Sequence, residues 1–222
     1  MAKARDDFNF LFRPRGPRQE EAAELWRRCR ILFLFGSPGS GKTHISLGLA
    51  LESLLGGRKS KTKPKLMLCR PTVSIGEEVG ILPGGLEEKL GPWLAPFRDV
   101  LRNLAFDDWT KLEAALEVEA VSAGMLQGRN ISDAVMICDE AQSLNELQVY
   151  LLLTRISNGG RLIICGDPGQ TTRDRKPKRK PPIIAAAEKI GGLDAVAVVE
   201  FTSADVVRDP LVADILHALD GD

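Results

Sequence analysis

The octapeptide GSPGSGKT at residues 36–43 follows the apolar run ILFLF at residues 31–35 and opens a helix-like segment. It fits the pattern G-x-x-x-x-G-K-[ST], whose glycines let the backbone wrap around phosphate groups and direct N–H groups inward. Lys42 is then expected to neutralise the β- and γ-phosphates, and the Thr43 hydroxyl to ligate Mg²⁺. The predicted nucleotide-binding residues are Gly36, Ser37, Pro38, Gly39, Ser40, Gly41, Lys42 and Thr43.

A second signal is VMICDEAQ at residues 135–142, an apolar run that ends in two adjacent carboxylates. Two like charges repel unless solvent or a cation offsets them. A phosphate-binding loop needs a carboxylate at the end of a neighbouring parallel strand to hold Mg²⁺, and Asp139 fits that role. Glu140 is expected to orient and activate the attacking water as a general base. The second acid favours hydrolysis, because kinases must exclude water.

The pentapeptide GDPGQ at residues 166–170 ends a later apolar run. A carboxamide at a strand end beside a nucleotide is well placed to contact the γ-phosphate. Gln170 is therefore predicted to distinguish ATP from ADP. Without the two preceding motifs, the pentapeptide would be read as a Gly-Pro turn.

Strands and helices are predicted to alternate along the chain. Five apolar runs lack polar alternation, as strands buried on both faces do: 31–35, 66–69, 134–138, 161–165 and 195–200. Helix-like segments span 19–30, 43–55, 86–104 with a break at Pro92, and 183–189, and an extra extended piece is expected near Leu116–Val121. This alternation indicates an α/β fold with a parallel sheet covered by helices. We expect an extension over 1–16 and a single domain over 17–222, with an insertion at 70–133 and a basic loop at 173–182.

Composition narrows the class of protein. Thirty Lys and Arg balance thirty Asp and Glu, so no global field indicates nucleic acid or a membrane surface. The four cysteines, at 29, 69, 138 and 165, form no Cys-x-x-Cys pair, and buried reduced thiols are expected rather than zinc ligands or disulfides. No run approaches the roughly 20 apolar residues of a membrane span, and the N-terminus lacks a signal-peptide core. A soluble cytoplasmic protein is expected.

Together these motifs resemble the PhoH family, whose core is similar to the first lobe of superfamily 1 helicases. The resemblance covers about residues 17–218. Besides GSPGSGKT, it rests on RPTVSIGEEVGILPGGLEEKLGPWLAPF (70–97), MLQGRNISDAVMICDEAQ (125–142), LLTRISNGGRLIICGDPGQ (152–170) and SADVVRDPLV (203–212). It implies a RecA-like sheet in the order 5-1-4-3-2, with strands numbered along the chain. It also implies ATP hydrolysis, with RNA or single-stranded DNA as a partner.

The resemblance implies roles for two further residues. Gln19 matches the family's adenine-reading glutamine; a plain helix-start residue is the alternative. Arg208 in DVVRDP matches a family arginine, and a guanidinium at the γ-phosphate would stabilise transition-state charge. Superfamily 1 helicases take such an arginine from a second lobe, for which this chain has no room. Arg208 is therefore expected to act on a neighbouring subunit in a homo-oligomeric ring such as a hexamer; a surface arginine is the alternative.

Residues for nucleic-acid binding are predicted from charge and position. Six of the eight residues in 173–180 are Lys or Arg, and such a loop can follow a phosphate backbone by charge alone. A solvated loop is the alternative for this run. The charged candidates are Arg173, Arg175, Lys176, Lys178, Arg179 and Lys180. Further candidates, by resemblance to helicase-like cores, are Arg70, Thr72, Thr154 and Arg155.

Two other function classes compete with a nucleic-acid-coupled ATPase. Thymidine kinases of one type also combine a phosphate-binding loop with a DEAQ-like block, but they tend to carry paired zinc cysteines, which this sequence lacks. An ATP-gated scaffold would not need Glu140. Family members often carry a further N-terminal domain or a PIN nuclease domain; neither pattern is present, so no nuclease activity is expected.

The expectation for Arg208 can be tested by mixing subunits. If Arg208 acts across a subunit boundary, mixed oligomers of Arg208→Ala and Lys42→Ala chains should regain part of the ATPase activity that each lacks alone. Mass measurement must first establish that the oligomers are mixed. Absence of rescue in such oligomers would assign Arg208 to its own subunit or to a structural role.

Overall fold

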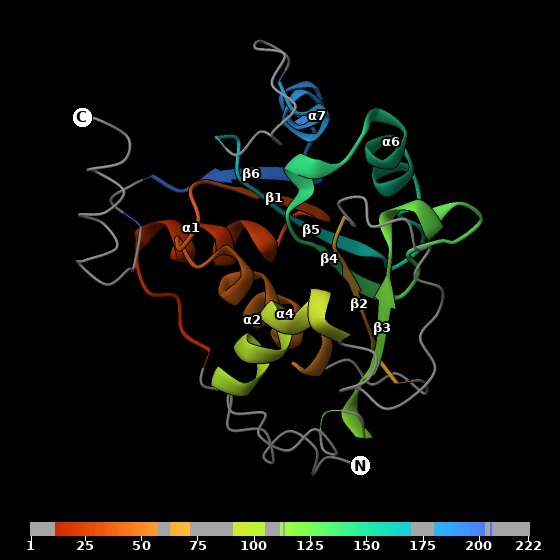
Figure 1. The fold of residues 1–222 in the computed structure, drawn as a ribbon. Coiled ribbons are helices and arrows are strands. Elements are labelled where there is room, and N and C mark those ends of the chain that lie inside the picture. The colour runs from red at the N-terminus through yellow and green to blue at the C-terminus, as the bar shows by residue number, and fades with distance from the viewer. Residues whose placement is uncertain are drawn as a thin grey trace.

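In the computed structural model, six strands of the described part of the chain form one parallel sheet (Figure 1). The structure describes residues 12–56, 63–71, 91–104, 112, 114–169, 180–202 and 205. The strands are β1 (Ile31–Phe35), β2 (Lys65–Cys69), β3 (Glu117–Val121), β4 (Ala134–Cys138), β5 (Arg161–Gly166) and β6 (Val196–Glu200). Their spatial order is β3-β2-β4-β5-β1-β6, and every pairing is parallel.

This order confirms the RecA-like sheet predicted from sequence. The five predicted strands appear in the expected order, and the extra extended piece becomes β3, the edge strand beside β2. The edge position of β3 explains its mixed burial, because one long side of an edge strand has no neighbour. Glu119 of β3 forms ion pairs with Lys65, at 2.6 Å, and with Arg129, which hold the edge in register.

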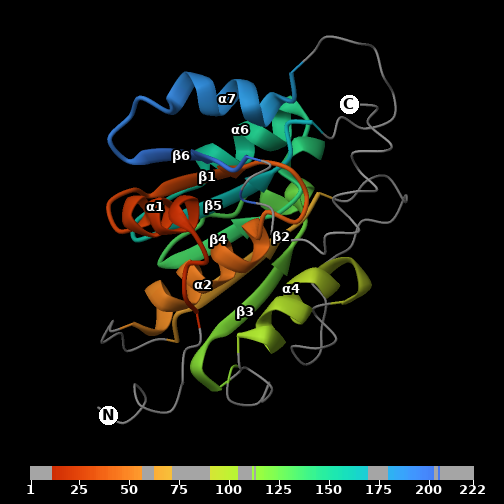
Figure 2. The same ribbon diagram turned by 90° about the vertical axis from the view of Figure 1, so that its left-hand side faces the viewer.

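Helices cover both faces of the sheet (Figure 2). Among the described residues they are α1 (Pro17–Trp26), α2 (Lys42–Leu55), α4 (Gly91–Asn103), α6 (Glu146–Thr154) and α7 (Pro182–Ile190). Alternate residues of β1 point to opposite faces: Leu32 and Leu34 join the core cluster under α1, α2 and α4, whereas Phe33 and Phe35 join the cluster under α6 and α7. This explains why the strand sequence is apolar at every position.

Some helix predictions need correction. The first helix ends at Trp26 rather than at residue 30. The segment predicted over 86–104 with a break at Pro92 is helical over α4, Gly91–Asn103, in the residues that the structure describes. Residues 86–90 lie outside the described residues. Helix α6 was not predicted from its apolar run, although Asn145 and Gln148 form a capping box at its start. The proposed boundary between residues 16 and 17 stays a prediction.

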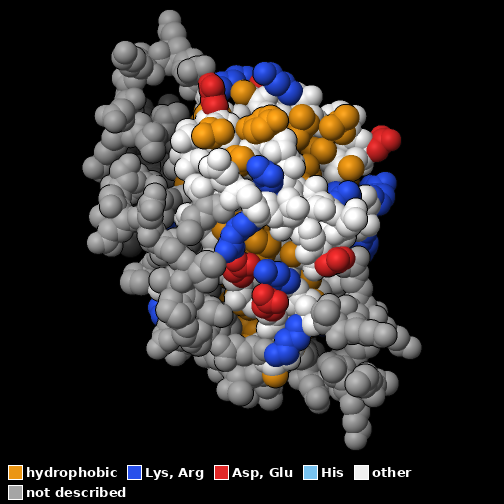
Figure 3. All heavy atoms as spheres, turned by 90° about the vertical axis from the view of Figure 1, so that its right-hand side faces the viewer, with side chains coloured by type: hydrophobic (Ala, Val, Ile, Leu, Met, Phe, Trp, Pro, Cys, Tyr) orange, Lys and Arg blue, Asp and Glu red, His pale blue; other side chains and the backbone are white. Residues whose placement is uncertain are grey.

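The face of the molecule that carries α6 has exposed apolar side chains, which gather in the upper part of Figure 3. Leu147 and Tyr150 of α6 are 66% and 65% exposed, while Val149 and Leu152 of the same helix are buried. Among the described residues, no helix is long and apolar enough to cross a membrane. The cytoplasmic location stays a prediction.

Arg161 joins the start of β5 to α1 and α2. Its guanidinium carbon lies 3.5 Å from the centroid of the Trp26 ring, and its nitrogens donate to the Cys29 carbonyl at 3.1 Å and to Ser53 Oγ at 3.2 Å. Trp26 Nε1 also donates to Ser53 Oγ, at 2.7 Å. A cation–π contact and several hydrogen bonds to a charged group thus meet at the edge of the sheet where the strands begin.

We predict that Arg161→Ala lowers the free energy of unfolding by about 2–3 kcal/mol, because the substitution removes all these interactions together. Urea unfolding followed by circular dichroism measures the change. The control is Arg18→Ala, since Arg18 forms an exposed ion pair with Glu21 and its removal should leave stability unchanged. Equal stability of the Arg161→Ala and Arg18→Ala proteins would contradict the assignment.

Candidate active site

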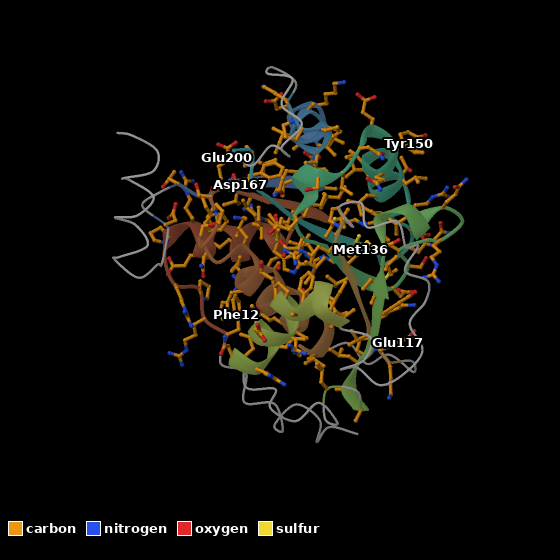
Figure 4. All side chains as sticks on the ribbon, viewed as in Figure 1. Phe12, Glu117, Met136, Tyr150, Asp167 and Glu200 are labelled. Atoms are coloured by element: carbon orange, nitrogen blue, oxygen red, sulfur yellow. The ribbon has the colours of Figure 1, made fainter. Side chains whose placement is uncertain are left out.

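The carboxyl ends of β1, β4 and β5 meet at one edge of the sheet, because the strands are parallel and adjacent in the order β4-β5-β1. The phosphate-binding loop leaves β1 there and enters α2 at Lys42. Figure 4 labels two residues at this end of the sheet, Asp167 after β5 and Glu200 at the end of β6, and β1 lies between their strands. Ligands of open α/β sheets bind at this edge, so the predicted site occupies the expected place.

Two glycines of the loop are required by its packing. Gly36 has φ 150°, and a Cβ there would lie 2.6 Å from the carbonyl oxygen of Phe201. Gly41 has φ 80°, a left-handed conformation, and a Cβ there would lie 2.8 Å from Nε2 of Gln19. The loop is therefore held between the segment after β6 and the start of α1.

Lys42 lies against the loop that it closes. Its Nζ donates to the carbonyl oxygens of Gly36 at 2.7 Å and Ser37 at 2.8 Å, and to Ser40 Oγ at 3.3 Å. Burial lowers the pKa of Lys42, because the charged form loses hydration. A bound anion would stabilise the charged form of this partly desolvated ammonium. Binding phosphate is the function predicted for Lys42.

Thr43 and Asp139 are in contact. The Thr43 hydroxyl donates to Asp139 Oδ2 at 3.3 Å, joining α2 to the end of β4. Asp139 is 5% exposed, and burial, followed by the charge of Glu140, raises its pKa. A buried carboxylate beside a hydroxyl is an oxygen donor pair that a hard cation would stabilise. Among the described residues no group of three or more His, Cys, Asp or Glu could hold a metal. A pair of oxygen donors fits Mg²⁺, which is usually held by one or two protein oxygens and completes its coordination with phosphate and water oxygens.

Glu140 turns away from its neighbour through an uncommon backbone conformation. Its φ of 56° and ψ of 35° are left-handed, which costs a non-glycine residue on the order of 1–3 kcal/mol. Whereas Asp139 contacts Thr43, Glu140 Oε1 pairs with Arg70 Nη2 at 3.3 Å, and its Oε2 accepts from Gln142 Nε2 at 2.6 Å. The two adjacent carboxylates are thereby assigned to different partners.

Gln19 also lies at the loop. It is 5% exposed, and its Oε1 accepts from the backbone N–H of Arg15 at 3.0 Å. Its amide nitrogen faces Gly41, as the close approach to that glycine shows. Its role toward adenine stays a prediction.

The nucleic-acid candidates are distributed over both ends of the strands. Arg70 follows β2 and lies in the site, paired with Glu140. Thr154 and Arg155 lie at the other end, where the strands begin, because α6 ends beside Ile131, just before the start of β4. Lys180 precedes α7, and its Nζ pairs with Glu188 at 2.6 Å. Outside the described residues lie Thr72, Gln170, Arg173, Arg175, Lys176, Lys178, Arg179 and Arg208.

Sequence reasoning missed two residues of the site. Gln142 Oε1 accepts a hydrogen bond from the backbone N–H of Asp167 at 3.0 Å, and Gln142 Nε2 donates one to Glu140. Gln142 therefore links the ends of β4 and β5. Asp167 is 8% exposed, and its Oδ1 accepts from Gly169 N at 2.8 Å. Both residues belong to motifs that stand out in the sequence, but their partners depend on how the chain turns after each strand. The four cysteines are free and buried, as predicted.

Comparison with known proteins identifies a family and supports the fold. The family described as PhoH-like protein matches residues 11–220. A PhoH-like protein of Bacillus subtilis (strain 168) is 35% identical over 204 residues, which cover 91% of this chain and 62% of the relative. Protein PhoH of Escherichia coli (strain K12) is 32% identical over 192 residues, covering 85% of this chain and 52% of that protein. The chain thus spans little more than half the length of these relatives.

Comparison with solved structures also supports the fold. The large terminase from the thermophilic bacteriophage D6E superposes with a TM-score of 0.57 at 13% identity, covering 92% of this chain and 50% of the terminase. At this identity the likeness shows the fold and nothing further. The family match covers nearly the whole chain and includes both the phosphate-binding loop and the Asp-Glu pair. The chain belongs to the PhoH-like protein family, and its core is that of a P-loop NTPase.

Proposed function

We propose that this chain is a Mg²⁺-dependent ATPase whose turnover is coupled to RNA or single-stranded DNA. The observation that carries the ATPase proposal is the contact of Thr43 with Asp139 at 3.3 Å, with Glu140 directed to other partners beside it. This arrangement separates a cation-holding carboxylate from a carboxylate that is available for proton transfer.

Each residue has a distinct part in the proposed reaction. The loop N–H groups and Lys42 bind the phosphates, and Thr43 and Asp139 would hold Mg²⁺, which when bound offsets phosphate charge. A water oxygen forms a bond to the γ-phosphorus while the bond to the bridging oxygen of ADP breaks. The proton of that water passes to the Glu140 carboxylate. Gln170 and Arg208 are proposed to contact the γ-phosphate.

Hydrolysis is favoured over transfer to a small-molecule acceptor by the exposure of the proposed base. The Glu140 side chain is 40% exposed, so water reaches it in the resting protein. A kinase site must instead exclude water from the γ-phosphate. An ATP-gated scaffold gives no reason for a carboxylate in a strained backbone conformation next to Asp139.

The nucleic-acid proposal rests on charge near the same edge of the sheet. Arg70 follows β2, and its side chain is 26% exposed. The basic run 173–180 follows β5 by only a few residues in the sequence. Cations at one edge can bind a phosphate backbone without reading its sequence. A ring of identical subunits, with Arg208 reaching the neighbouring site, is the assembly proposed for coupling binding to remodelling.

Substitutions separate nucleotide binding from hydrolysis. Lys42→Ala should weaken ATP binding by about 100-fold or more, because the loop loses its cation. Glu140→Gln should keep ATP affinity within about threefold and lower kcat on the order of 10²- to 10⁴-fold, since only proton transfer is removed. Titration with a fluorescent ATP analogue measures the affinity, and phosphate release measures kcat.

The matched control is Glu24→Gln, which makes the same change on the exposed face of α1 and should behave as wild type. Unchanged ATP affinity in the Lys42→Ala protein would refute the nucleotide site. Full turnover by the Glu140→Gln protein would remove Glu140 from the mechanism and favour a scaffold.

Neutralising the basic run tests the nucleic-acid proposal. Replacing the six Lys and Arg residues of 173–180 by Gln should weaken binding of single-stranded RNA and flatten its salt dependence, by a slope of about 0.7 for each phosphate that the run no longer neutralises. Fluorescence anisotropy over a salt series measures both. The control is Arg27→Gln with Arg28→Gln, two exposed residues before β1, at the other edge of the sheet. A salt slope equal to wild type would make 173–180 an ordinary solvated loop.

A further inference from the structure

Gln142 is a buried polar residue with both ends of its side chain engaged. It lies in a short 3-10 turn (Ala141–Ser143) directly after the Asp-Glu pair and is 9% exposed. Its Nε2 donates to Glu140 Oε2 at 2.6 Å, and its Oε1 accepts from the backbone N–H of Asp167 at 3.0 Å. A carboxamide offers an acceptor oxygen and a donor nitrogen in one plane without carrying a charge, which is what these two partners require.

The first bond restrains the proposed general base. With Arg70 on Oε1 and Gln142 on Oε2, the Glu140 carboxylate is held at both oxygens. Each carboxylate oxygen has two lone pairs, so both remain able to accept from a water molecule. The neighbouring charged groups have other proposed roles, Lys42 toward phosphate and Asp139 toward the cation. They do not hold the side chain of Glu140 in place.

The second bond connects this restraint to the end of β5. Asp167 N is a backbone group, and the turn that carries it is stabilised by Gly169 N donating to Asp167 Oδ1 at 2.8 Å. Gly166 also packs close to Gln142, since a Cβ there would lie 3.4 Å from Gln142 Oε1. The position of the Gln142 side chain therefore depends on the backbone of the turn after β5. The position of the Glu140 carboxylate depends in turn on Gln142.

We propose that Gln142 is a positioning residue for hydrolysis, which fixes the Glu140 carboxylate relative to the β5 turn so that it accepts the proton of the attacking water. This inference rests on the proposed ATPase function. It adds a residue outside both the phosphate-binding loop and the Asp-Glu pair. Misplacing a catalytic group by about 1 Å costs on the order of 100-fold in rate, so a restraint of this kind has a measurable effect.

The test uses variants that remove one or both bonds. Gln142→Met keeps the length of the side chain and removes both, whereas Gln142→Glu keeps an acceptor for Asp167 N and removes the donor to Glu140. Each should lower kcat by about 10- to 100-fold and leave KM within about threefold, because the groups that bind ATP are untouched. The matched control is Gln148→Glu, which preserves the bond from Asn145 N at the start of α6 and should behave as wild type.

A double-mutant cycle distinguishes positioning from general structural damage. If Gln142 acts through Glu140, adding Gln142→Met to Glu140→Gln should not lower the residual single-turnover rate further. Thermal unfolding and binding of a fluorescent ATP analogue establish that each variant is folded. If the Gln142→Met protein does not fold, the cycle is run with Gln142→Glu.

Three results would overturn the proposal: a kcat within about twofold of wild type, a rise in KM alone, or an equal decrease in rate in the presence and absence of Glu140. These are distinguishable from failure of the proposed function. Wild-type protein that shows no turnover beyond the Lys42→Ala background would overturn the ATPase proposal and this inference together. Lys42-dependent turnover with any of the three results overturns this inference alone.

Discussion

The contact between the Thr43 hydroxyl and the Asp139 carboxylate is the constraint on which the rest of the site depends. The two residues come from α2 and from the end of β4, and β5 lies between β4 and β1 in the sheet. The loop after β1 must therefore cross the end of β5 to bring Thr43 to Asp139. At this crossing the backbone N–H of Gly36 donates to the carbonyl of Gly166 at 3.2 Å. Parallel strands that end at one edge make the crossing short.

Electrostatics at this crossing support the magnesium-nucleotide site that we propose. Burial raises the pKa of Asp139 and lowers that of Lys42, so the charged form of each group is disfavoured by desolvation in the absence of a partner. A nucleotide with its cation supplies the opposite charge to both. The left-handed backbone of Glu140 is a further local cost that the surrounding contacts must offset. Charged groups that are buried without a full set of partners are typical of functional sites.

Sequence patterns predicted the strands and the glycine-rich connection from β1 to α2 well, because each depends on local information. Continuous apolar runs are required of strands buried on both faces, and the loop pattern is set by close phosphate contact. The strand order followed from the family resemblance. Helix α6 was missed since its sequence is apolar on nearly every side and lacks helical periodicity. Because α6 ends near the start of β4, Thr154 and Arg155 lie away from the end of the sheet that carries the phosphate-binding loop.

The parts of the site that sequence could not predict are those that depend on tertiary geometry. Gln142 follows the Asp-Glu pair directly, but its bond to Asp167 joins positions 25 residues apart. Arg70 was predicted to contact nucleic acid, and its partner in the structure is Glu140. Both partnerships arise where turns after different strands converge. Such convergence is a property of the sheet order rather than of any local pattern.

The most direct test of this account is a crystal structure with Mg²⁺, ADP and a metal fluoride that mimics the transferred phosphoryl group. We expect the fluoride in the loop beside Lys42, with Mg²⁺ on Thr43 Oγ1 and Asp139 reaching the cation directly or through water. A water in line with the bond that breaks should lie about 3 Å from a Glu140 oxygen. A phosphoryl mimic outside the loop, or a Glu140 carboxylate without contact to the in-line water, would refute the proposed hydrolytic mechanism.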